Sequence, residues 1–239
     1  MSEIMMPGGE MAKRPLNFFW VVDCSGSMSG SKIGTVNYTI QQTIPEMKQA
    51  ADENTNAQLY IQAMKFDTGA QWITQNPVKI EDYTWQDMQA YGLTSLGAAF
   101  ELLCGQLSIP PMSERALPPV IVLLSDGEPT DNYKDSLQKL LSMPWGKKAV
   151  RIAIAIGEGA EKSVLEEFTG NPEYVLEANN ATALASMIKW ASTVAKQVSS
   201  PASKRADVEE SANQAGPVSI DLPPVIDMNT IDIDADDVW

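Results

Sequence analysis

Residues 17–30 read Asn-Phe-Phe-Trp-Val-Val-Asp-Cys-Ser-Gly-Ser-Met-Ser-Gly. The apolar run over 17–22 predicts a strand that is buried on both faces, as in a parallel sheet. Asp23, Ser25 and Ser27 then alternate in a turn that Gly26 makes flexible, so that their side chains can converge. Carboxylate and hydroxyl oxygens suit a hard divalent cation. Taken alone, the pattern fits a turn or a helix cap equally well.

Two later segments favour the cation. Thr94 lies in the glycine-flanked turn 92–97 that precedes an apolar helical pattern, and Asp126 follows a strongly apolar strand at 120–124. Both turns carry oxygen ligands of the kind that Mg²⁺ or Mn²⁺ prefers. The sequence therefore predicts one shared metal site, formed by Asp23, Ser25, Ser27, Thr94 and Asp126.

From about Leu16 to Val198 the chain resembles the von Willebrand factor A domain family, which has a metal-ion-dependent adhesion site. The resemblance implies that Ser25, Ser27 and Thr94 bind the ion largely directly. It implies that Asp23 and Asp126 bind directly or through water. It also implies that an Asp or Glu of a partner protein completes the coordination shell.

Apolar strands alternate with helical patterns along the chain. This order predicts an α/β fold with a doubly wound, mostly parallel central sheet flanked by helices, as in the Rossmann-like von Willebrand A fold. Pro45 is expected to kink or divide its helix, and Pro144 to end the preceding one. The expected strands are 17–22, 57–66, 70–74, 120–124, 150–156 and 174–176, and the expected helices are 31–53, 95–107, 131–142, 163–168 and 181–198.

The chain divides into a flexible leader (1–14), the domain (15–198) and an acidic, disordered tail (199–239). We interpret the tail as a solubilising segment. Two alternatives stay open, a docking peptide for another protein and a peptide that docks on the domain's own metal face.

Composition excludes several classes of protein. The net charge of −14 argues against nucleic acid and anionic membrane as partners. With no histidine, Ser-His-Asp catalysis and His-ligated zinc are impossible. Two cysteines, no secretory segment in 1–15 and no long apolar run favour a cytoplasmic protein.

These features predict a non-enzymatic interaction module. The segments 93–97 and 124–131 resemble bacterial TerY/YegL-like proteins, which are associated with tellurium resistance and with stress or defence. That resemblance implies a Ser/Thr kinase and a metal-dependent phosphatase as partners. The alternatives are a Mg²⁺-dependent phosphoester hydrolase and a kinase substrate phosphorylated within 199–203 or at Thr230.

Other polar residues receive weaker interpretations. Asp131 fits either a support for a metal ligand or the cap of the helix that follows it. We expect Cys24 to point into the core, Asp67 to form a turn and Glu128 to lie on the rim of the site. The Gly26–Lys32 stretch lacks the spacing of a phosphate-binding loop.

Overall fold

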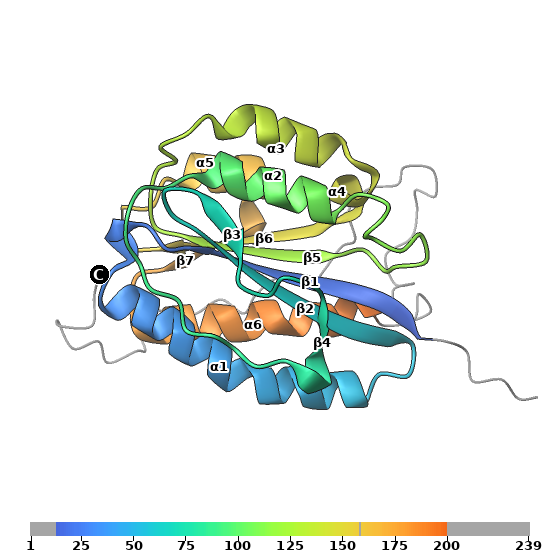
Figure 1. The fold of residues 1–239 in the computed structure, drawn as a ribbon. Coiled ribbons are helices and arrows are strands. Elements are labelled where there is room, and N and C mark those ends of the chain that lie inside the picture. Colours follow the sequence, from blue (N-terminus) through green and yellow to red (C-terminus); the bar gives the residue numbers. More distant parts are fainter. Residues whose placement is uncertain (1–12, 158, 200–239) are drawn as a thin grey trace, which may run out of the picture.

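The computed structural model describes residues 13–157 and 159–199. A central sheet is covered by helices on both faces (Figure 1). The strands are β1 (Arg14–Asp23), β2 (Ala57–Phe66), β3 (Ala70–Trp72), β4 (Val78–Lys79), β5 (Val120–Ser125), β6 (Val150–Ile156) and β7 (Val175–Ala178). The α-helices are α1 (Ser31–Asp52), α2 (Leu96–Gln106), α3 (Tyr133–Ser142), α4 (Pro144–Lys148), α5 (Lys162–Thr169) and α6 (Ala181–Ser199). Short 3₁₀ turns are η1 (Gly26–Met28), η2 (Ile80–Asp82) and η3 (Pro172–Tyr174).

The sheet has the strand order β3-β2-β1-β5-β6-β7, and β4 pairs with β2. Strands β1, β2, β5, β6 and β7 run parallel, whereas β3 and β4 are antiparallel to β2. Helices α1 and α6 cover one face, and α2 to α5 cover the other (Figure 1). The predicted doubly wound α/β fold is confirmed.

Strand β1 explains the uninterrupted apolar run. Phe18, Trp20 and Val22 contribute to the hydrophobic core against α1 and α6, and Phe19 and Val21 contribute to the core on the opposite face. Because successive side chains of a strand alternate between its faces, a central strand with two helical layers must be apolar at every position.

Pro45 does not divide its helix, whereas the helix before Pro144 ends where the sequence predicted. Pro45 lies inside the single helix α1, whose range is unbroken. It lies on the exposed side of that helix, as does Gln41, so water can satisfy the carbonyl group that the missing N–H leaves unpaired. The helix α3 does end at Ser142, but Pro144 then starts α4, because its fixed φ and absent N–H suit a first helical position.

The described residues begin and end close to the bounds of the predicted domain, 15–198. Strand β1 begins at Arg14, one residue inside the expected leader, and α6 reaches Ser199. Residues 1–12 and 200–239, which include most of the predicted leader and tail, lie outside the described residues. Within the described part of the chain, no helix combines the length and apolar character that crossing a membrane requires.

Candidate metal centre

Four of the five predicted site residues lie at or just beyond the carboxyl ends of two adjacent strands. Parallel strands β1 and β5 pair with Val22 opposite Leu124, so the turns that contain Asp23 and Asp126 are neighbours. From β1 the chain crosses to β2 on one side, and β5 lies on the other side. Such a switch point is where ligands bind in open α/β sheets.

Asp23 is fully buried at the end of β1. Its Oδ1 accepts a hydrogen bond from the backbone N–H of Ser25 (2.8 Å), and its Oδ2 accepts one from the Ser125 hydroxyl (2.6 Å). Burial raises the pKa of this carboxyl above its ordinary value, although the hydrogen bonds from Ser125 and Ser25 lower it. A nearby cation would offset the cost of burying this charge.

Ser125 was missed by the sequence analysis. It is the last residue of β5, and it is buried. A serine at the end of an otherwise apolar strand, just before Asp126, was the available signal. Its partner Asp23 lies 102 positions away, so the contact itself could not be predicted from local pattern.

The two serines and Asp126 form a chain of hydroxyl and carboxylate groups. The hydroxyl oxygens of Ser25 and Ser27 lie 3.0 Å apart, and the Ser27 hydroxyl donates to Oδ1 of Asp126 (2.7 Å). A hydroxyl that donates to a carboxylate still has lone pairs for an ion. Ser25 and Asp126 are buried and Ser27 is exposed, so the site opens to solvent at Ser27.

Thr94 joins this group from the loop before α2. A β-carbon built on Gly127 would lie 3.6 Å from Oγ of Ser27 and 3.8 Å from Oγ1 of Thr94, so both hydroxyls approach the same point of the backbone. Thr94 is held by two hydrogen bonds with Thr130, from its N–H to the Thr130 hydroxyl (3.1 Å) and from the Thr130 N–H to its carbonyl (2.8 Å). The structure thus brings all five predicted residues together.

Backbone hydrogen bonds also fasten the loop before Thr94 to the Asp23 turn. The N–H of Gly26 donates to the carbonyl of Gly92 (3.1 Å), and the N–H of Tyr91 donates to the carbonyl of Cys24 (2.7 Å). Gly92 has a φ of 86°, a conformation that other residues rarely adopt. These bonds fix the relative positions of two segments that each carry candidate ligands.

Asp131 caps a helix, but not the following one, which was one of the two sequence interpretations. Its Oδ1 and Oδ2 accept hydrogen bonds from the backbone N–H groups of Gly97 (3.0 Å) and Ala98 (3.1 Å), at the start of α2. It therefore caps the preceding helix, while Asn132 stands at the cap position of α3. The negative charge also suits the positive end of the α2 dipole. Asp131 thereby ties the Asp126 loop to the helix that follows Thr94.

Two further interpretations concern single residues beside the site. Cys24 is buried, and burial raises the pKa of its thiol to about 12, in agreement with a packing role. Asp67 forms a turn as predicted, because its side chain accepts from the Gly69 N–H (3.3 Å) and pairs with Lys65 (2.8 Å).

The residues present fit a hard divalent cation. All candidate donors are oxygens, from two carboxylates and three hydroxyl groups, which matches the preference of Mg²⁺ and Mn²⁺. Over the described ranges there is no cluster of three or more His, Cys, Asp or Glu side chains suited to a metal. A site rich in neutral hydroxyls leaves part of the ion's charge available for an anionic ligand.

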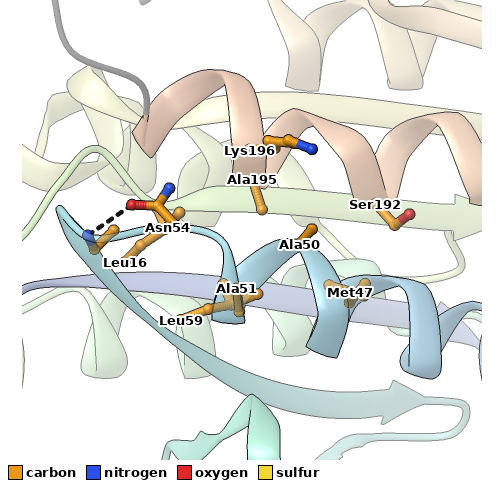
Figure 2. Close-up of a pocket in the computed structure, with 10 residues that line it drawn as sticks. Leu16, Met47, Ala50, Ala51, Asn54, Leu59, Ser192, Ala195 and Lys196 are labelled. Carbon is orange, nitrogen blue, oxygen red and sulfur yellow. Dashed lines mark hydrogen bonds between the residues drawn. The ribbon is translucent and has the colours of Figure 1, made fainter.

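A separate pocket lies at the opposite end of the domain, between the C-terminal halves of α1 and α6 (Figure 2). It is lined by mostly apolar side chains, and Asn54 accepts a hydrogen bond there from the N–H of Ala57 (3.0 Å). Leu16 and Leu59, near the amino ends of β1 and β2, line its floor. It is therefore far from the candidate metal centre and shares no residue with it.

The family model of the von Willebrand factor type A domain matches residues 18–190. The chain belongs to this family. Domains of the family commonly mediate metal-dependent protein–protein interactions through a metal-ion-dependent adhesion site, and they are typically non-enzymatic. No curated protein matches the sequence.

Solved structures share the von Willebrand A fold at low sequence identity. The pilus adhesin SpaC from Lactobacillus rhamnosus GG, in its open conformation, has a TM-score of 0.62 and 13% identity over 79% of this chain and 31% of its own. A von Willebrand factor type A protein from Catenulispora acidiphila has a TM-score of 0.56 and 14% identity, with 77% and 43% covered.

A third similar structure, proximal thread matrix protein 1 from the mussel byssus, has a zinc-occupied adhesion-site motif. Its TM-score is 0.55 at 17% identity, with 77% of this chain and 46% of that chain covered. The present chain thus spans less than half the length of each of these three proteins.

Proposed function

We propose that this von Willebrand A domain is a Mg²⁺- or Mn²⁺-dependent module that captures an Asp or Glu side chain of a partner protein. The observation that carries this proposal is the convergence of Asp23, Ser25, Ser27, Thr94 and Asp126 on one solvent-accessible point beyond β1 and β5. When bound, the ion would supply positive charge that replaces part of the hydration lost by the partner's carboxylate.

The chain's own residues have distinct tasks in this proposal. Ser25, Ser27 and Thr94 offer neutral oxygens, and Asp126 offers charge from a buried position next to the exposed Ser27. Asp23 cannot turn freely, because Ser25 and Ser125 hold both of its oxygens. It therefore fixes the shape of the turn and contributes charge from a buried position. The exposed Ser27 marks the side from which a partner can approach.

We further propose a cytoplasmic role in a bacterial stress or defence system like those of TerY/YegL-like proteins. The support is the similarity of segments 93–97 and 124–131, which contain Thr94 and Asp126. The partners expected from that similarity are a Ser/Thr kinase and a metal-dependent phosphatase. The partner surface would then include the exposed Tyr91 and Leu93 beside Thr94.

Metal binding by the full chain tests the proposal directly. Isothermal titration with Mg²⁺ or Mn²⁺ should show one site in the wild type and greatly weakened binding in Ser25→Ala and Thr94→Ala. The matched control is Thr193→Ala, which removes an exposed hydroxyl whose hydrogen bond within the described part of the chain stays inside α6 (2.8 Å to the Trp190 carbonyl). Equal metal affinity in all four proteins would contradict the proposal.

A second experiment tests the partner. Capture of the proposed kinase or phosphatase by the wild type should be abolished by a chelator and by Ser25→Ala, since the ion links the two proteins. Capture that persists in chelator would place the contact elsewhere on the domain.

A further inference from the structure

Lys32 is the one basic side chain that contacts a candidate metal ligand among the ion pairs of the described residues. Its Nζ lies 2.6 Å from Oδ2 of Asp126, and the Asp126 side chain is only 1% exposed. With Ser27 donating to Oδ1, both oxygens of Asp126 have internal donors. The two donors differ, because the Ser27 hydroxyl keeps lone pairs for an ion and an ammonium group has none.

The position of Lys32 is not explained by helix stability. It is the second residue of α1, whose first turn contains no acidic residue. The amino end of a helix carries partial positive charge, so a lysine there is unfavourable. Lys32 is also partly withdrawn from water, with its side chain 21% exposed. The ion pair with Asp126 is therefore the interaction that accounts for its placement.

We propose that Lys32 is a built-in counter-cation at the metal centre. Its positive charge lowers the affinity for the metal ion and raises the affinity of the metal-bound site for an acidic ligand. This inference rests on the proposed function of the same site. Without an ion, Lys32 neutralises Asp126. With an ion bound, Lys32 adds positive charge beside it. This charge weakens metal binding by repulsion and favours an anionic partner group over a neutral one.

Electrostatics gives the expected size of the effect. The two aspartates contribute −2, and Lys32 reduces this to −1. Even with the screening of bulk water, a unit charge several ångströms from a divalent ion changes its binding by about tenfold. When Lys32 loses its charge, the affinity for the metal should therefore rise and the affinity for the acidic ligand should fall.

The test uses the full chain and Mn²⁺ alone, with free Mn²⁺ measured by electron paramagnetic resonance. Lys32→Met should bind Mn²⁺ about tenfold more tightly than the wild type, and Lys32→Arg should bind as the wild type does. The control is Lys139→Met, which removes an exposed ion pair of the same length (2.6 Å to Glu101) away from the site. If Lys32→Met does not fold, as judged by circular dichroism, Lys32→Gln replaces it.

A second readout measures the affinity of the metal-bound site for a carboxylate ligand. Acetate, used as a carboxylate probe in the presence of saturating Mn²⁺, should bind more weakly to Lys32→Met than to the wild type, by water-proton relaxation. A folded neutral variant with unchanged or weaker Mn²⁺ affinity would overturn the inference and leave the proposed function intact. Absence of Mn²⁺ binding by the wild type would instead overturn both.

Discussion

Replacing Asp131 by alanine should destabilise the whole domain, because this carboxylate caps α2 from a distant loop. It accepts two backbone hydrogen bonds, from Gly97 (3.0 Å) and Ala98 (3.1 Å), and both donors lie in the first turn of α2. Hydrogen bonds to a charged group contribute about 1.5–3 kcal/mol each, and water can recover part of this at a partly exposed site. The expected loss in the free energy of unfolding is therefore about 2–4 kcal/mol.

Thermal and urea denaturation in chelator measure this loss. For a domain of this size each kcal/mol corresponds to about 2–4 °C, so Tm should fall by roughly 5–15 °C. Asp131→Asn keeps one acceptor oxygen and should lose about half as much. Asp135→Ala is the matched control, because Asp135 is exposed and accepts only from the Asn132 side chain (3.0 Å) among its hydrogen bonds within the described residues. An unchanged Tm for Asp131→Ala would refute the assigned cap.

Three further predictions concern polar side chains that are withdrawn from solvent. Burial raises the pKa of Asp23, so its ionised form destabilises the fold increasingly as pH rises above the ordinary carboxyl pKa. In chelator, Asp23→Asn should therefore raise the urea midpoint at pH 7 but not near pH 3. The same substitution should abolish stabilisation by Mg²⁺. A lower midpoint at pH 7 would contradict this. Burial raises the thiol pKa of Cys24 to about 12 and that of Cys104 to about 11. Mass spectrometry after iodoacetamide treatment at pH 8 should therefore show both cysteines unmodified until urea unfolds the protein. Rapid labelling of the native protein would show instead that the thiols are accessible. Arg151 donates to four backbone carbonyls, so Arg151→Met should cost about 2–4 kcal/mol in urea unfolding, and a change below 0.5 kcal/mol would indicate that these bonds contribute little.

Much of the fold was predictable because it depends on local pattern. The apolar runs of β1 and β5, the alternation of strands with helices and the turn at Asp23 follow from side-chain periodicity and the conformational preferences of Gly and Ser. The convergence of the candidate metal residues was predictable for a related reason. Asp23 and Asp126 lie at or just beyond the ends of β1 and β5, and the carboxyl ends of parallel strands share one edge of the sheet.

The support around those residues was decided only by the tertiary structure. Ser125 reaches Asp23, Lys32 reaches Asp126, and Asp131 reaches the start of α2 across sequence separations of 102, 94 and more than 30 residues. Such contacts depend on strand register and on how the loops pack, which shift by single residues without changing any local pattern. The sequence by itself therefore determined the sheet and the positions of the candidate ligands, while three-dimensional packing determined which charged groups face one another around them.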